Sequence, residues 1–320
     1  MKRALLCSAF AALLTGCGLC PSPPSAATGT AARYPITDVA SAPATPVRNQ
    51  AKSGTCWAFG GVSLIESEAI RTRRCTPDLS EMWVVRHAYF EKAVKYVRTR
   101  GRVAFDQGGE IQDVLWLVDR YGIVPQSLYE GGAADGTYDH ASLAKAIRRL
   151  AKRIVDKKLY EKEHWQRMID EELDRRLGAR PDRFVIDGVA YTPFSYADSI
   201  GFRRDDYVAL TSFTHHPFFE RFVLEIPDNW AAHATLNIPL DSLMRLLDSA
   251  LAAGYTAAWD ADVSERGFGR RAGIALLPQQ EGRITLPAPE IVVDQPLRQR
   301  MFDTQATTDD HVMHIVGTAV

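Results

Sequence analysis

The segment from Pro46 to Arg73 constrains this chain more than any other part of its sequence. It reads PVRNQAKSGTCWAFGGVSLIESEAIRTR. Its apolar residues recur at spacings of four, three and four: Ala58, Val62, Ile65 and Ala69. This spacing predicts an amphipathic helix that begins at Cys56 and turns one face towards a core. Backbone N–H groups at a helix N-terminus stabilise a thiolate, and beside a cationic histidine the pKa of a cysteine can fall from about 8.5 to about 3–4. The pattern therefore favours Cys56 as a nucleophile over a small buried hydrophobe, the usual role of a free cysteine.

A glutamine lies six residues before this cysteine, on the loop that enters the helix. There the side-chain amide of Gln50 can donate a hydrogen bond to the oxyanion of a tetrahedral intermediate, together with the backbone N–H of Cys56. The pattern Gln-(five residues)-Cys-Trp-Ala-Phe closely resembles the signature of the papain superfamily of cysteine peptidases. Papain has a disulfide cysteine three residues before its nucleophile, whereas this chain has Ser53. The resemblance is therefore to the branch of bleomycin hydrolase and bacterial aminopeptidase C.

That resemblance extends over nearly the whole chain from Pro46 onward. The segments that carry it are LSEMWVVRHAYFEKA (79–93), QGGEIQDVLWLVDRYGIVPQSLYEG (107–131), SFTHHPFFERFVLEIPDNW (212–230) and GYTAAWDADVSERGF (254–268). It implies an α+β, papain-like fold with a helical left part over 46–137 and a β-rich right part over 182–320, which resembles an antiparallel barrel. Between them, 138–181 is highly charged with apolar residues at helical spacing, which predicts a helical insertion with a solvated face. The resemblance places the catalytic cleft between the two main parts.

A thiolate needs an imidazole that holds the ion pair and then protonates the leaving amine. Near the end of the chain, the sequence DHVM (310–313) has the pattern of a strand and resembles the Asp-His-Ala-Val strand of papain-like enzymes. The resemblance implies that His311 is the general base and acid. His314 lies three residues on, so in a strand it faces the opposite side and is expected to be structural.

Further site residues follow from the same resemblance. Trp57, Gly108 and Gly109 are expected to contact the substrate, the glycines because they let a peptide backbone approach closely. The paired glycines are also compatible with a plain turn before a helix. No metal and no cofactor are expected: His215 and His216 are adjacent, so in a strand they point to opposite faces, and no third ligand follows at a zinc-like spacing.

One element of the family is missing from this sequence. In papain-like enzymes an asparagine in Asn-Ser-Trp-Gly follows the histidine strand and orients the imidazole, as the carboxylate does in serine triads. Here the asparagines are Asn49, Asn229 and Asn237, all before His311, and the sequence stops at Val320. We therefore expect a chain shortened relative to its relatives, by truncation or by deletion, with an incomplete barrel and compromised activity.

The first residues predict export and a lipid anchor. Two basic residues precede an apolar run from Ala4 to Leu14, which is too short to span a bilayer. The run ends in LTGC (14–17), which resembles the bacterial lipobox and implies cleavage after a signal peptide of residues 1–16 and lipidation of Cys17. Residues 17–45, rich in Pro, Ala, Ser and Thr, are expected to form a flexible tether. Gly18 favours the periplasmic face of the outer membrane as the location.

These expectations combine into one leading function and one rival. The leading function is that of a cysteine-type peptidase, in this branch an aminopeptidase, which acts on peptides through Cys56 and His311. The rival is a catalytically impaired or inactive papain-fold surface lipoprotein that binds peptides or proteins, and the missing asparagine favours it. Nucleic acid is excluded as a partner, because 38 basic against 39 acidic residues give no basic surface for phosphates.

Overall fold

The computed structural model describes residues 37–132, 137–265, 267–269, 273–279 and 288–320. Pro35–Val320 form one compact unit. The predicted signal peptide, Cys17 and the predicted tether up to residue 36 lie outside the described residues. Within the described part, no helix combines the length and the apolar character that crossing a bilayer requires.

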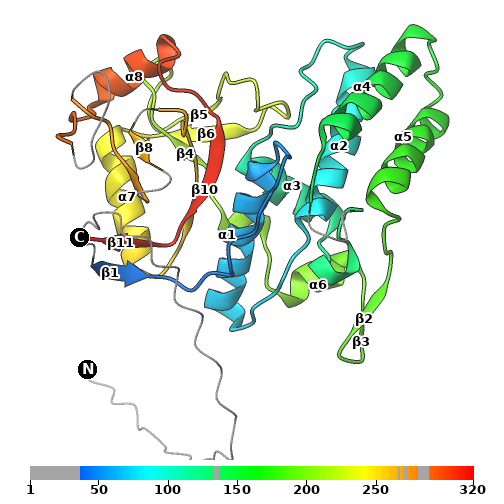
Figure 1. The fold of residues 1–320 in the computed structure, drawn as a ribbon, viewed down its shortest axis with the longest axis horizontal. Helices are drawn as coiled ribbons and strands as arrows, with labels where there is room; N and C mark the ends of the chain where they lie inside the picture. The colour runs from blue at the N-terminus through cyan, green and yellow to red at the C-terminus, as the bar shows by residue number, and fades with distance from the viewer. Residues whose placement is uncertain (1–36, 133–136, 266, 270–272, 280–287) are drawn as a thin grey trace, which may run out of the picture. The chain divides into compact units, whose positions relative to one another are not determined.

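Most helices belong to the first two thirds of the chain. They are α1 (Cys56–Arg73), α2 (Glu81–Arg98), α3 (Ile111–Tyr121), α4 (Ala141–Asp156), α5 (Lys162–Leu177), α6 (Pro193–Ser199) and the 3-10 turns η1 (Gln126–Leu128) and η2 (Arg204–Asp206). Helix α1 begins at Cys56, as the sequence predicts, and its predicted inner face from Ala58 to Ala69 is buried. Helix α2 lies at the centre of this group of helices and contacts α1, α3, α4 and α5 (Figure 1).

Helices α4 and α5 lie in the predicted insertion and pack onto α2. Their buried side chains belong to the same hydrophobic core as α1 and α2: Leu143, Ile147, Ile154, Trp165, Ile169 and Leu173. The guanidinium group of Arg86 in α2 is fully buried and pairs with Asp170 (2.8 Å) and Asp174 (2.7 Å) of α5. The outer faces carry exposed ion pairs such as Lys152–Asp156. Residues 138–181 are therefore part of the helical core as well as a solvated surface.

The later part of the chain is rich in short strands. The strands are β1 (Asp38–Ser41), β2 (Phe184–Ile186), β3 (Val189–Tyr191), β4 (Leu210–Thr211), β5 (Arg221–Val223), β6 (Ala234–Asn237), β7 (Ala257–Ala261), β8 (Phe268–Gly269), β9 (Ile274–Ala275), β10 (His311–Ile315) and β11 (Gly317–Ala319), with helices α7 (Leu240–Ala252) and α8 (Gln295–Asp303). The sheets have the orders β1-β11, β10-β7, β2-β3, β4-β6-β5 and β8-β9. Among the described residues no barrel closes, and the α+β, papain-like fold class is confirmed.

One strand lies where the sequence predicted a tether. Residues 38–41 form β1, which pairs antiparallel with β11, and the backbone groups of Thr37 and Val320 bond each other. Only Ala42, just after the strand, is buried. The polar composition of this stretch hides the strand, because backbone hydrogen bonds to a distant segment hold it rather than apolar side chains. The prediction of a flexible tether over residues 17–45 is therefore wrong for residues 38–41, which form this strand.

Candidate active site

Cys56 is the first residue of α1, at a helix end without a side-chain cap. Thr55 precedes it in a non-helical conformation, and the Thr55 carbonyl accepts a hydrogen bond from the Ala58 N–H (2.9 Å). The hydroxyl of Thr55 contacts the hydroxyl of Ser53 (2.7 Å) instead of the first turn. No side chain therefore caps the N–H groups of Cys56 and Trp57, and that of Trp57 bonds the Cys56 sulfur.

Strand β10 lies along α1 (Figure 1), and close packing holds the two together. A Cβ atom at Gly60 would lie 2.6 Å from Cγ1 of Val312, so glycine is what allows this approach. Nδ1 of His314 lies 2.8 Å from the hydroxyl of Ser63 in α1, and burial lowers the pKa of His314 to about 4. His314 thus has the structural position that the sequence predicts for it.

The same strand brings the region of His311 to the cysteine. The backbone N–H of Val312 bonds the Cys56 sulfur, so the residue that follows His311 touches the predicted nucleophile. His311 is half-buried at the start of β10, opposite Ala261 of β7. The two ends of the sequence that were expected to share a site therefore meet across α1 and β10.

The electrostatic surroundings of Cys56 differ from the prediction. Burial raises the pKa of the Cys56 thiol, and the carboxylates of Asp260 and Asp228 raise it further. Hydrogen bonds from the backbone N–H groups of Val312 and Trp57 oppose the rise. The predicted lowering of the pKa is therefore not found, because desolvation and negative charges from distant parts of the chain outweigh the N–H groups of the helix end.

Gln50 is tied into the loop that precedes α1. Its Nε2 donates to the carbonyl of Ser53 (2.7 Å), while the N–H and the hydroxyl of Ser53 both bond the carbonyl of Gln50 (3.1 and 2.8 Å). A side-chain amide has two N–H donors. One of them is thus used within the loop, and the other is the one that an oxyanion would take.

Gln107 braces this loop, a role that the sequence analysis missed. Its Oε1 accepts a hydrogen bond from the Gly54 N–H (2.8 Å), and its carbonyl accepts one from Nε1 of Trp57 (3.0 Å). The buried indole of Trp57 is thereby fixed beside Cys56. No local pattern reveals this contact, because the partners are about fifty residues apart in sequence.

The paired glycines lie where other side chains press closely on the backbone. A Cβ atom at Gly108 would lie 2.1 Å from the Asp228 carboxylate, and one at Gly109 would lie 3.0 Å from the indole of Trp57. The buried ammonium group of Lys92 also holds this loop, because it donates to the carbonyls of Asp106 (2.7 Å) and Gly108. Internal packing is sufficient reason for both glycines, and their contact with substrate stays a prediction.

All three asparagine side chains bond backbone groups of other residues. Asn49 Oδ1 accepts from the Ala51 N–H (2.8 Å). Asn229 bonds the N–H (2.9 Å) and the carbonyl (3.0 Å) of His233, and Asn237 bonds the N–H of Phe213 (2.9 Å). Asn229-Trp230 therefore does not stand in for the missing Asn-Ser-Trp-Gly motif.

His215 and His216 do not lie in a strand, so the geometric reason for excluding them as metal ligands is wrong. They form a bend, and both rings reach Glu225, at 3.2 and 2.8 Å. Glu225 supplies the third ligand atom that the sequence spacing lacks, so the three side chains are close enough to hold a cation. Gln299 accepts from the Thr214 N–H through Oε1, so its Nε2 donates to Nδ1 of His215 (3.0 Å). The proton of neutral His215 then lies on Nε2, facing Glu225, which opposes metal binding there.

Three acidic residues near Cys56 were also missed. Side-chain oxygens of Glu110, Asp260 and Asp309 lie within 4.8 Å of one another, a spacing that could hold a cation. These residues precede α3, lie in β7 and precede β10, respectively. Nothing local in the sequence joins them, since they are brought together by the pairing of β7 with β10 and by the packing of both strands and of α3 against α1.

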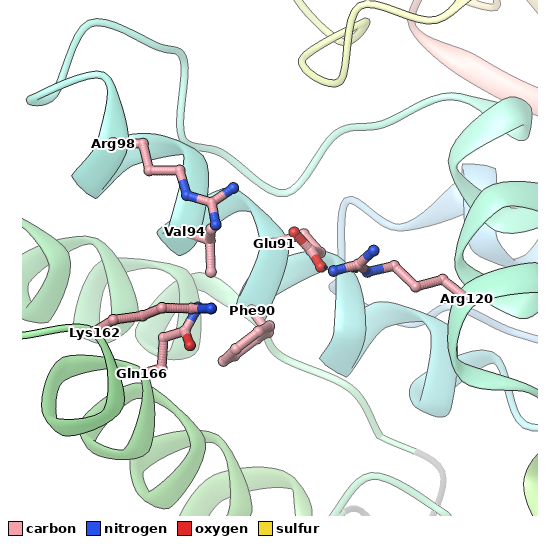
Figure 2. A pocket seen from close by; sticks show the side chains of 7 residues that line it. All are labelled: Phe90, Glu91, Val94, Arg98, Arg120, Lys162 and Gln166. Atoms are coloured by element: carbon pink, nitrogen blue, oxygen red, sulfur yellow. Dashed lines mark hydrogen bonds and ion pairs between the residues drawn. The ribbon is translucent and has the colours of Figure 1, made fainter.

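A hollow of about 200 Å³ lies elsewhere, among α2, α3 and α5 (Figure 2). It is lined by Phe90, Glu91, Val94, Arg98, Arg120, Lys162 and Gln166. None of the predicted site residues belongs to it, and Glu91 and Arg120 pair within it (2.9 Å). It is therefore separate from the candidate active site.

The fold and the site define a class: a papain-like α+β protein with a cysteine at a helix N-terminus and a histidine at the start of an adjacent strand. Residues 35–168, less than half of the chain, match the family model described as papain family cysteine protease. This match includes Gln50, Cys56 and both glycines, ends before His311, and supports cysteine peptidase activity.

A solved structure supports the fold over most of the chain. The structure of this chain is similar to the crystal structure of PepW from Lactobacillus rhamnosis HN001, with a TM-score of 0.64 and 18% sequence identity. The similarity covers 89% of this chain and 72% of that one. At this identity the comparison shows the fold alone. No protein with a curated description matches the sequence.

Proposed function

We propose that this protein is a cysteine peptidase that hydrolyses peptide bonds through Cys56, with His311 as general base and acid. The observation that carries the proposal is the position of Cys56 at the uncapped start of α1, with the strand of His311 bonded to its sulfur through Val312. The family match over residues 35–168 supports the same reaction.

In this proposal the Cys56 proton passes to His311, and the sulfur attacks the peptide carbonyl. The backbone N–H of Cys56 and the second amide N–H of Gln50 bind the oxyanion. His311 then protonates the leaving amine, which departs as the thioester forms. Water, deprotonated by His311, attacks the thioester and releases the acid product and the thiol.

We further propose that the enzyme prefers peptides with a free N-terminus. The support for aminopeptidase specificity is the resemblance to the bleomycin hydrolase and aminopeptidase C branch, carried by segments such as 79–93 and 107–131.

Labelling with a thiol-directed epoxide tests the nucleophile. We expect one equivalent of label on Cys56 between pH 6 and 8, abolished in Cys56→Ala and retained in Cys75→Ser, because Cys75 is the other free thiol in the described residues. Hydrolysis of free-amine and acetylated peptides by the same three proteins gives the activity. Label on Cys75 alone, or hydrolysis that persists in Cys56→Ala, would contradict the proposal.

A non-catalytic peptide-binding protein is the second candidate. It is favoured by the raised pKa of the Cys56 thiol and by the three asparagines being engaged elsewhere. This candidate predicts no stoichiometric epoxide label and no hydrolysis, together with saturable binding of peptides to the unmodified protein.

Attachment to the membrane through a lipid on Cys17 is proposed from the LTGC sequence alone. The expected result is incorporation of labelled fatty acid into the wild-type protein in a bacterial host, and its loss in Cys17→Ser. Release of Cys17→Ser, but not of the wild type, into the soluble periplasmic fraction would agree with the outer-membrane location. Equal fractionation of the two proteins would exclude the anchor.

A further inference from the structure

Glu110, Asp260 and Asp309 each have a buried side-chain oxygen that no protein group satisfies. These atoms are Oε1 of Glu110, Oδ1 of Asp260 and Oδ2 of Asp309. Glu110 is only 8% exposed, and its carboxylate lies within 4.8 Å of those of the other two residues. A buried acceptor without a partner is costly, so three of them on neighbouring carboxyl groups indicate a ligand that supplies donors.

The charged groups that act on this acidic trio (Glu110, Asp260 and Asp309) are further carboxylates, among them Asp113 and Asp228. Burial raises the pKa of Glu110 to about 9 and that of Asp260 to about 7, and neighbouring carboxylates add to both shifts. The nearby cation Lys92 acts on Asp228 and donates to the loop below Gly108. A positive charge placed among these three carboxyl groups would stabilise their ionised forms, which burial and the neighbouring acids disfavour.

The trio borders the proposed nucleophile. Asp260 is the cross-strand partner of Val312, whose backbone N–H bonds the Cys56 sulfur. Glu110 directly follows the paired glycines, and Asp309 lies two residues before His311. Any group bound by the trio therefore lies near Cys56.

We propose that Glu110, Asp260 and Asp309 form a subsite for the ammonium group of a peptide substrate. An ammonium group has three N–H donors, one for each unsatisfied oxygen, and its single charge lies on a compact head. Calcium fits less well, because it takes six to eight oxygen ligands, whereas this cluster supplies three side chains. This inference rests on the proposed peptidase function and deepens it.

The subsite also couples substrate recognition to the reactivity of the sulfur. Asp260 is the carboxylate that most raises the pKa of Cys56. A bound ammonium group neutralises part of that charge and so favours the thiolate. Substrates with the ammonium group are therefore bound more tightly and attacked faster, whereas an acetylated peptide leaves the acidic trio unsatisfied.

Kinetics with three peptides of one sequence test the subsite: one with a free α-amine, one acetylated, and one acetylated with a lysine side chain in place of the N-terminal amine. For Glu110→Gln and Asp260→Asn, we expect the ratio of kcat/KM for the free over the acetylated peptide to fall at least ~10-fold. The control Glu225→Gln removes an exposed carboxylate outside the trio and should keep the wild-type ratio. Selection of the lysine peptide alone would assign the subsite to a side-chain amine, which also supports the proposal.

Binding to Cys56→Ala, measured by calorimetry, keeps the inference testable if no peptide is hydrolysed. The free-amine peptide should bind at least ~10-fold more tightly than the acetylated one, and Cys56→Ala/Glu110→Gln should bind both alike. Equal binding of the two peptides to Cys56→Ala would overturn the subsite, as would peptidase activity that a chelator abolishes and calcium restores. If acetylated peptides are hydrolysed through Cys56 but the ratio is unchanged in both acid variants, the subsite fails while the peptidase stands.

Discussion

At the scale of single residues, the ionisation of Cys56 depends on groups from four separate parts of the chain. The helix end and Val312 favour the thiolate, whereas burial, Asp260 and Asp228 oppose it. The sequence predicted the influence of the helix end, because that influence is local. It missed the others because desolvation and the approach of distant carboxylates are properties of the folded chain.

A pH profile of alkylation tests this balance. The rate at which iodoacetamide modifies Cys56 in a Cys75→Ser background should rise with pH as the thiolate forms. Asp260→Asn removes one of the negative charges that raise the pKa of Cys56, so its profile should move to lower pH. Glu225→Gln serves as the control and should leave the profile in place. A shift of Asp260→Asn to higher pH would show that this carboxylate does not act on the sulfur as described.

At the scale of elements, the pairing of α1 with β10 is what assembles the site. The sequence predicted both elements, from the apolar spacing after Cys56 and from the strand pattern around His311. It did not predict their contact, which depends on Gly60 receiving the side chain of Val312. Nor did it predict β1, whose partner is at the other end of the chain.

A double-mutant cycle tests this contact. Gly60→Ala should bring its methyl group against Val312, at a cost of about 1–3 kcal/mol that outweighs a gain in helix propensity of about 1 kcal/mol. Val312→Ala alone should leave a cavity, but in the double variant it should make room for the new methyl group. Urea unfolding should therefore give a favourable coupling free energy. Strictly additive free energies of unfolding would show that the two side chains do not meet.

The contact of α2 with α5 contains a buried charge. Removing both Asp170 and Asp174 (Asp170→Asn/Asp174→Asn) leaves the guanidinium of Arg86 buried and unpaired, which should cost roughly 3–5 kcal/mol. Arg86→Met removes the charge itself, so it should cost less. Asp156→Asn breaks an exposed pair and should change the free energy of unfolding by less than about 1 kcal/mol. Urea unfolding at one pH measures all three, and the reverse order of the first two would refute the buried pair.

At the scale of the whole molecule, folding buries acids that are protonated in the native state. The pKa is raised to about 9 for Glu110 and to about 7 for Glu81 and Asp260. These residues are 29, 150 and 179 positions apart, so no sequence pattern could have grouped the two that lie near Cys56. The sequence could predict the fold class and the position of Cys56 at the start of α1, but not the acidic surroundings that the fold creates.

The raised pKa of Glu110 determines how stability depends on pH. The native carboxyl keeps its proton up to about pH 9, whereas the unfolded one loses it near its ordinary pKa of 4.5. The native state thus binds one proton more, and the free energy of unfolding should fall by roughly 1.4 kcal/mol per pH unit from this group. The slope is to be measured between pH 6.5 and 8, because His140 and His314, whose pKa values are lowered to about 4, change the free energy of unfolding below that range. Glu110→Gln should flatten the slope, and an unchanged slope would contradict the assignment.

The most direct test of the central claim is to trap the acyl-enzyme. The protein is mixed with a free-amine peptide ester and quenched in acid within milliseconds, and the peptide containing Cys56 is then analysed by mass spectrometry. We predict a thioester on Cys56 that is present in Cys75→Ser and absent in Cys56→Ala. Rapid product formation by Cys56→Ala, or an acyl group found only on another residue, would contradict the claim that this sulfur is the nucleophile.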